Sequence, residues 1–152
     1  MYPLRLFGDP VLKQRAREVE ELDGDLVTLV HGMYDTMDLE DGIGLAAPQV
    51  GVRKRLFTFD LHEGDGPAVV INPEITEREG EVLSDEGCLS VPGYRFEVVR
   101  AERVTMRGLD LDGVLLLDRV DPDVRKEALR DMRTREMRAH EPTPRSGHDR
   151  GL

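Results

Sequence analysis

Apolar residues recur at helical spacing near the start of the chain and predict one amphipathic helix over residues 25–39. Leu26, Leu29, Val30, Met33 and Met37 are separated by one, three or four positions, so they share one face of a helix. Either of two aspartates, at positions 23 and 25, is placed to cap the first turn. A glutamate, an aspartate and a glycine follow at positions 40–42, and this polar run ends the helix.

After this helix the apolar residues come in short runs that are typical of strands. Residues 55–61 and 68–71 predict two strands, and the polar turn between them indicates a hairpin. The dipeptide Asn72-Pro73 breaks the apolar pattern and is expected to end the second strand. A further strand is predicted through residues 81–83.

Farther along, residues 96–107 predict one long strand in which polar and apolar positions alternate imperfectly. Residues 109–113, with three polar or glycine positions, predict a hairpin turn, and residues 114–117 predict the strand that follows it.

A second amphipathic helix is predicted from Asp121-Pro122 onward, because four apolar residues there share a helical face. The chain then ends in a segment with two prolines, glycines and many charges, a composition typical of disorder. We therefore expect a single domain over residues 1–138 and a disordered tail over residues 139–152. The apolar face of the second helix consists of Val124, Ala128, Leu129 and Met132.

Composition narrows the classes of protein that this chain can represent. Its 152 residues, 39% apolar, are enough for one hydrophobic core. The formal net charge of −10 repels polyanions and argues against specific nucleic-acid binding. Residues 125–152 nevertheless carry 8 lysines and arginines against 5 acidic residues, a local charge of +3. No apolar run approaches the length of a bilayer span and the first residues lack a signal-peptide pattern, so we expect a cytoplasmic protein without a membrane partner.

The single cysteine, Cys88, excludes an internal disulfide framework and is the first candidate for chemistry. A lone cysteine is most often a small buried apolar residue. Its neighbours favour a role here: Gly87 leaves room on one side and Glu86 can anchor a loop or a basic group. Ser90 and Pro92 suit a turn whose N–H groups can face an anion. A thiolate held there is a soft metal ligand or a nucleophile.

A second candidate site lies in the segment from Gly42 to Gln49. Its glycines permit close approach of the backbone, and the Gln49 amide can donate a hydrogen bond to an oxyanion. The simpler interpretation is a tight helix-to-strand turn with Gln49 on the surface, and local chemistry alone favours it.

Together these segments resemble the first two signature motifs of the peptide deformylase family, GxGLAAxQ and EGCLS, and both matches are complete. The resemblance spans roughly residues 3–113 and resumes at residues 114–122. The residues that carry it are Gly42, Gly44, Leu45, Ala46, Ala47 and Gln49 in the first motif, Glu86 to Ser90 in the second, and Asp9-Pro10-Val11-Leu12, Ile71-Asn72-Pro73 and Arg95 outside the motifs.

The resemblance implies an α+β fold of short antiparallel strands packed with helices, and removal of the formyl group from N-formylmethionyl peptides. A divalent metal (iron, zinc or nickel) would be held by a cysteine and two histidines, and Cys88 is the cysteine by the motif match. Gln49 and the backbone N–H of Leu89 would stabilise the oxyanion, and Ile43 and Gly44 would pair with the substrate backbone. The other substrate-binding residues implied by the resemblance are Glu86, Gly87 and Arg95.

The chain departs from the family at the third motif, HExxH, which places both histidine ligands on one face of a helix. His31 and His62 are isolated in the sequence. The pair His140-Glu141 begins like the motif, but prolines follow at once and His148 stands eight positions on instead of four. In the family a strand and the HExxH helix separate the segments that here adjoin at Gly113, so a whole block is missing. The expected fold therefore lacks the central metal-binding helix and part of the core.

Three hypotheses follow. The chain is a deformylase whose ligands are replaced by His140, His148, water or a partner chain, or it is an inactive relative that at most binds peptides. In the third, Cys88 acts as a covalent nucleophile, but the sequence offers no obvious base for it. We favour the inactive relative, because a cysteine alone cannot supply a three-ligand metal site. By resemblance, the basic C-terminal helix is also a candidate contact with the ribosome.

Overall fold

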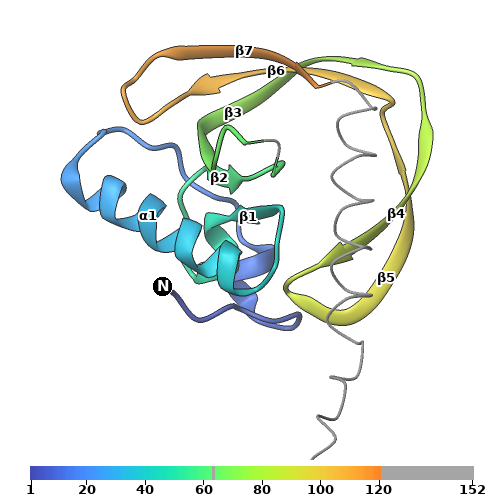
Figure 1. Ribbon diagram of the computed structural model, residues 1–152, viewed down its shortest axis with the longest axis horizontal. Coiled ribbons are helices and arrows are strands. Elements are labelled where there is room, and N and C mark those ends of the chain that lie inside the picture. Colours follow the sequence, from blue (N-terminus) through green and yellow to red (C-terminus); the bar gives the residue numbers. More distant parts are fainter. Residues whose placement is uncertain (63, 121–152) are drawn as a thin grey trace, which may run out of the picture.

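The computed structural model describes residues 1–62 and 64–120 of the chain. Within them one α-helix packs on a five-stranded antiparallel sheet, and a separate two-stranded ribbon stands beside this body (Figure 1). This is the expected α+β architecture of short antiparallel strands. The predicted second helix, the domain end at residue 138, the tail over 139–152, and both His140 and His148 lie outside the described residues.

The helix, α1 (Gly24–Leu39), confirms the prediction from apolar spacing to within one residue. Asp23, not Asp25, caps it, because its side chain accepts a hydrogen bond of 2.8 Å from the backbone nitrogen of Leu26. The five apolar residues of the predicted face are all buried. None of the helices within residues 1–62 and 64–120 is long and apolar enough to cross a membrane.

The five-stranded sheet has the order β1-β2-β3-β6-β7, and each strand is antiparallel to its neighbours. Both predicted hairpins are part of this sheet: β2 pairs with β3, and β6 pairs with β7 across the turn that ends at Gly113. Its strands are β1 (Gly44–Ala46), β2 (Leu56–Phe59), β3 (Ala68–Glu79), β6 (Arg103–Leu109) and β7 (Leu115–Val120), and two short 3-10 helices, η1 (Pro10–Lys13) and η2 (Ala47–Val50), lie outside it.

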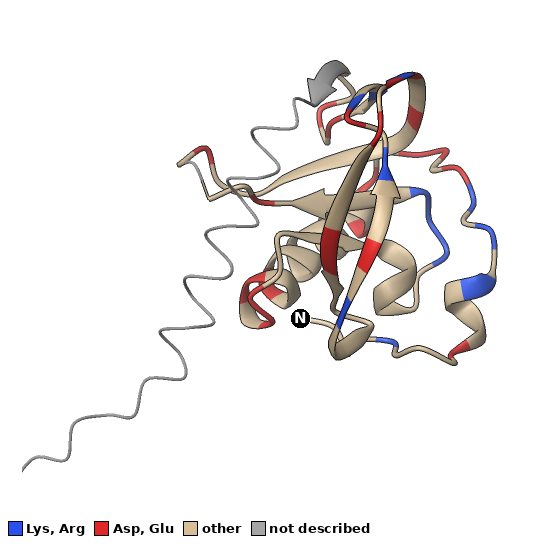
Figure 2. Cartoon of the chain, turned by 90° about the vertical axis from the view of Figure 1, so that its right-hand side faces the viewer, with Lys and Arg blue, Asp and Glu red and all other residues tan. Residues whose placement is uncertain are grey.

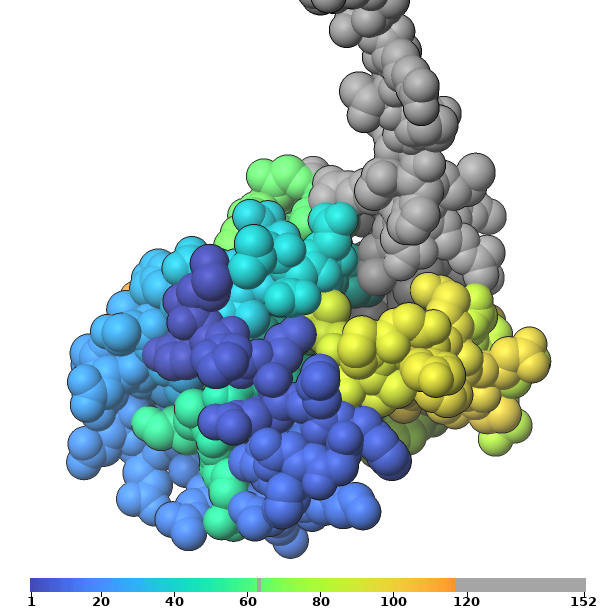
Figure 3. Space-filling view, turned by 90° about the horizontal axis from the view of Figure 1, so that it is seen from below, coloured from blue at the N-terminus to red at the C-terminus, as the bar shows by residue number. Residues whose placement is uncertain are grey.

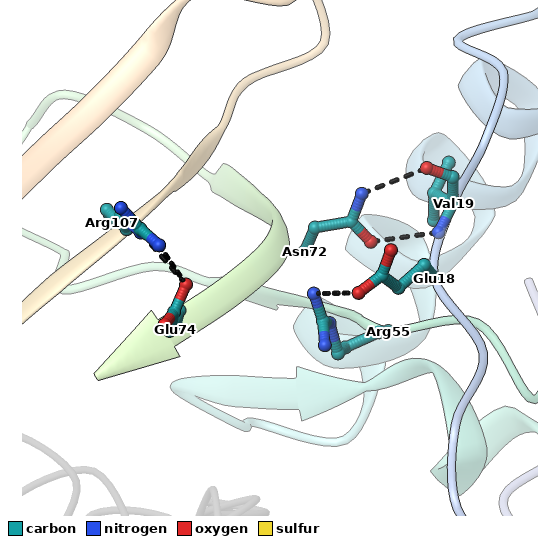
Figure 4. A network of polar contacts seen from close by, with 6 residues as sticks. All are labelled: Glu18, Val19, Arg55, Asn72, Glu74 and Arg107. Atoms are coloured by element: carbon teal, nitrogen blue, oxygen red, sulfur yellow. Dashed lines mark hydrogen bonds and ion pairs between the residues drawn. The ribbon is translucent and has the colours of Figure 1, made fainter. Parts of the chain in front are cut away.

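The prediction that Asn72-Pro73 ends a strand is wrong, because β3 continues through it to Glu79. The register with β6 shifts between Ile71 and Glu74, so the dipeptide forms a bulge. A bulge accommodates both residues: Asn72 adopts a left-handed φ of 52°, and a proline costs no ladder bond where pairing is interrupted. The Asn72 side chain also binds both backbone groups of Val19, at 2.8 and 2.9 Å (Figure 4).

The single long strand predicted over residues 96–107 is also wrong, because the chain changes sheets there. Strand β5 (Val91–Arg100) pairs only with β4 (Val82–Cys88), whereas β6 begins at Arg103 and pairs with β3 and β7. Figure 1 shows the chain leaving the ribbon and joining the sheet. Neither glycine nor proline marks this break in the sequence, so the pattern gave no signal of it.

The hydrophobic core lies in the first half of the chain. Up to residue 116, where side chains are described, every buried apolar residue falls between Val19 and Ile71. The second half leaves large apolar side chains in solvent: Leu83 is 60% exposed and Val99 is 62% exposed. The ribbon is therefore held by its own ladder and by a few partly buried residues, with little core of its own.

Candidate functional site

A cavity of about 600 Å³ lies between the loop after α1 and the turn that joins β4 to β5. Its walls are residues 40–44, 49, 62, 87–89 and 91–95. The two motif segments, about forty positions apart in the sequence, thus face one another across one hollow. Of the predicted site residues, the cavity wall contains Ile43, Gly44, Gln49, Gly87, Cys88, Leu89 and Arg95.

Gly42 lets the two walls come together. It is buried, and a Cβ atom added there would lie 2.7 Å from Cδ1 of Leu89, closer than side-chain contacts allow. Its nitrogen donates to the carbonyl oxygen of Met37 at 2.9 Å, which turns the chain at the end of α1. The glycine of the first motif therefore packs directly against the second motif.

Both polar atoms of the Gln49 side-chain amide have hydrogen-bond partners. Its Oε1 accepts from the backbone nitrogen of Ala46 at 2.8 Å, and its Nε2 lies 3.2 Å from Oγ of Ser90. The same nitrogen lies 3.9 Å from Sγ of Cys88. The donor end of the amide thus faces the thiol, and Gln49 is partly buried.

The N-terminal segment ties the two walls together from outside. The backbone nitrogen of Phe7 donates to the carbonyl oxygen of Ser90 at 2.8 Å, and that of Arg5 donates to the carbonyl oxygen of Gln49 at 2.7 Å. Figure 3 shows this segment, in dark blue, lying against the yellow turn between β4 and β5. One extended stretch thereby fixes the spacing of both motif segments.

Strand β1 leaves an open backbone edge at the cavity. Within residues 1–62 and 64–120 it is the edge strand of the sheet and pairs with β2 alone. The nitrogen of Asp60 donates to the carbonyl oxygen of Ile43, so in an antiparallel ladder the next residue, Gly44, turns its own N–H and C=O away from β2. Gly44 is exposed, and these two groups are available to an added strand.

Charged residues on the ribbon are held in cross-strand pairs. Nε of Arg95 lies 3.0 Å from Oδ2 of Asp85, and Nη2 of Arg100 lies 2.7 Å from a carboxylate oxygen of Glu86. Figure 2 shows this ribbon in front of the body, with acidic positions on β4 and both acidic and basic positions on β5. Glu86 is not among the residues that line the cavity, unlike its predicted partners.

The described residues do not fit a three-ligand divalent metal site. The Cys88 thiol is exposed in the cavity, but within residues 1–62 and 64–120 no three His, Cys, Asp or Glu side chains gather as a metal would need. His31 stacks edge-on against Tyr34 on α1 and is not part of the cavity wall. Cys88 is thus a single soft donor beside an amide and a hydroxyl.

Several wall residues lie outside the predicted site, and two of them, His62 and Tyr94, carry side chains that could contact a ligand. His62 belongs to the cavity wall, with its side chain 21% exposed and its Nδ1 3.5 Å from Oδ1 of Asp60. Tyr94 belongs to the wall as well. His62 was set aside as an isolated histidine, and no sequence spacing could show that the turn after β2 faces the second motif.

Comparison with known proteins gives consistent matches. The family described as "Polypeptide deformylase" matches residues 1–123. A peptide deformylase of Thermodesulfovibrio yellowstonii is 42% identical, covering 78% of this chain and 88% of the relative, and one of Clostridium botulinum is 51% identical, covering 72% and 74%. The crystal structure of peptide deformylase from Thermotoga maritima superposes with a TM-score of 0.77 at 40% identity, covering 82% of this chain and 85% of that one.

The first of these alignments leaves part of the relative without a counterpart in this chain. It runs over 146 positions but takes in 78% of the 152 residues, which is about 119 residues. About 27 positions of the alignment therefore have no counterpart in this chain. A strand and a helix of ordinary length would fill such a gap.

Proposed function

Because this chain belongs to the polypeptide deformylase family, we propose that its cavity binds the N-formylmethionyl end of peptides. The observation that carries the proposal is the convergence of both motif segments on one cavity, with the donor end of Gln49 aimed at Cys88. The relatives are peptide deformylases, and their name specifies the chemical group that such a site acts on.

The peptide backbone is proposed to pair with the open edge of β1. A main-chain contact at Gly44 places the peptide in an extended conformation and makes recognition largely independent of sequence. The formyl oxygen would then accept hydrogen bonds from the Gln49 amide and from the backbone N–H of Leu89, both at the cavity wall. Gly87 and Arg95 line the far side, and Arg95 is held in place by Asp85.

We propose that the chain on its own binds the peptide without hydrolysing it. Hydrolysis in the family depends on a divalent metal, which activates water and polarises the formyl group, and the described residues supply one thiolate to such a metal. The sequence contains no HExxH from which the two histidines could come. Cys88 as a covalent nucleophile would need a base. The candidates in the cavity wall are His62, whose ring lies 3.5 Å from Asp60, and the carboxylates of Glu40 and Asp41.

A second candidate is favoured by the relatives' shared name: hydrolysis of the formyl group with metal ligands supplied from elsewhere. His140 and His148, water or a partner chain would then complete the coordination of Cys88. Iron, zinc and nickel are the metals to test, because the family's cysteine and histidine ligands suit all three.

The test measures binding and hydrolysis on the same folded, anaerobically purified sample. Fluorescence polarisation with a dye-labelled formyl-Met peptide is expected to show saturable binding, and the same peptide without the formyl group is expected to bind more weakly. Gln49→Glu keeps the acceptor for the Ala46 nitrogen but replaces the donor beside Cys88, so it is expected to weaken binding of the formyl peptide more than that of the unformylated one.

Elemental analysis and formate release then separate the two candidates. We expect far less than one equivalent of iron, zinc or nickel, and formate release no greater than that of Cys88→Ser. About one equivalent of metal together with formate release that Cys88→Ser abolishes would establish the hydrolase. Failure of any formyl peptide to bind the folded protein would refute the proposed site itself.

A further inference from the structure

Two exposed aromatic side chains stack on β5, and one of them, Tyr94, belongs to the cavity wall. Tyr94 and Phe96 lie two positions apart on β5, and their rings stack with centroids 6.4 Å apart and planes inclined by 18°. Tyr94 is 67% exposed and Phe96 48% exposed, although Tyr94 is part of the cavity wall. Large aromatic surfaces left in solvent beside a hollow are a marker of ligand contact.

A bulge in the ribbon aims Tyr94 at the cavity. Cys88 pairs with Val91 and the preceding residue, Gly87, pairs with Arg95, so three extra residues of β5 face a single step of β4. Within this bulge Gly93 has a φ of 80°, a left-handed conformation that a residue with a side chain adopts only under strain. Bulges of this kind redirect side chains and are common beside functional sites.

The two rings lie on the inner face of the ribbon. Alternation along β5 puts Val98 on the same side as Phe96, and Val98 is paired with Ser84, which is only 9% exposed. On the opposite side Val99 is paired with Leu83, and both are at least 60% exposed. The more buried face is the one that turns toward the body of the protein, and Tyr94, which belongs to the cavity wall, connects the aromatic pair to the cavity.

We propose that the Tyr94–Phe96 pair binds a large apolar side chain of the peptide, at one of the two residues that follow formylmethionine. The proposal rests on the proposed function, because it needs a peptide in the cavity. Tyr94 would contact the peptide side chain and Phe96 would support the ring of Tyr94. The cross-strand ion pairs at Arg95 and Arg100 hold the ribbon around the rings, so the aromatic surface is formed before the peptide binds.

The test uses dye-labelled formyl-Met tetrapeptides with Phe, Leu, Ser or Asp at the second or the third position, measured by polarisation with the full chain. Phe or Leu at one of these positions is expected to bind about five- to tenfold more tightly than Ser, the range given by aromatic contact and partial burial. Tyr94→Ser is expected to abolish that preference, whereas formyl-Met peptides with Ser at both positions keep their affinity.

Val99→Ser is the matched control, because it removes an exposed apolar side chain from the outer face of the same strand. It is expected to leave the preference unchanged. Equal affinity for all side chains in the wild type, or an unaltered preference in folded Tyr94→Ser, would overturn this inference while leaving the proposed function intact. If no formyl-Met peptide binds at all, the proposed function fails and this inference fails with it.

Discussion

Asn72 should be one of the most sensitive polar positions in the protein. Its side chain accepts from the backbone nitrogen of Val19 at 2.8 Å and donates to the carbonyl oxygen of Val19 at 2.9 Å, and Val19 is only 8% exposed (Figure 4). Its φ of 52° is a conformation that asparagine tolerates better than most residues. Asn72 therefore joins the N-terminal segment to the bulge of β3.

The size of the effect follows from these contacts. Asn72→Ala loses two hydrogen bonds worth about 0.5–1.5 kcal/mol each, and alanine in a left-handed conformation adds about 1–2 kcal/mol. The expected loss of unfolding free energy is about 2–5 kcal/mol. Asn72→Gly loses the same bonds without the conformational strain, so we expect about 1–3 kcal/mol. Asn72→Asp keeps the acceptor and loses one donor, for about 0.5–1.5 kcal/mol.

Urea unfolding followed by circular dichroism measures all three variants, with the slope of the transition checked for constancy. The expected order of stability is wild type, Asp, Gly, Ala. If the alanine and glycine variants were equally stable, the left-handed conformation at this position would carry no cost and the bulge would be misassigned. If Asn72→Ala were as stable as the wild type, the two bonds to Val19 would contribute nothing.

Three further results are expected. A Cβ atom at Gly108 would lie 2.3 Å from a methyl carbon of Val70 and 3.0 Å from a backbone oxygen. Gly108→Ala should therefore lower the unfolding free energy measured in urea by about 1–3 kcal/mol. Gly24 has open space around it, so Gly24→Ala should cause no measurable loss. Burial raises the pKa of Tyr34 above its ordinary value of 10, so the stability that the neutral side chain contributes is complete below pH 10 and is lost as pH rises further. The midpoint temperature of thermal unfolding should therefore fall less steeply with rising pH in Tyr34→Phe than in the wild type. Hydrogen exchange should be faster for amides of the β4–β5 ladder than for those of β2–β3, since the ribbon has almost no core; equal protection would contradict this.

The sequence predicted the elements whose signals are local. The apolar spacing of α1 and the turn at residues 109–113 depend on neighbours within a few positions, and both are found as expected. The continuation of β3 through Asn72-Pro73 was missed because it depends on pairing with β6, about thirty positions away. The change of sheet between Arg100 and Arg103 was missed for the same reason, since each half follows a different partner strand.

In the site as well, residues with a local sequence signal were predicted, whereas residues whose position depends on distant segments were not. The two motifs identified about half of the cavity wall, because glycines and a cysteine in a fixed pattern reflect close packing that the structure contains, such as Gly42 against Leu89. His62 and Tyr94 were missed, since each reaches the cavity only through a turn or a bulge whose direction the sequence does not specify.

In the proposed function, peptide binding and hydrolysis depend on different parts of the chain. The cavity walls are built from the end of α1, the edge of β1 and the β4–β5 turn, and the N-terminal segment holds them together through Arg5 and Phe7. None of these contacts involves a residue after Arg95. The walls can thus keep their mutual contacts in a sequence that contains no HExxH. If the two parts are separate in this way, the protein should bind formyl peptides specifically and release no formate.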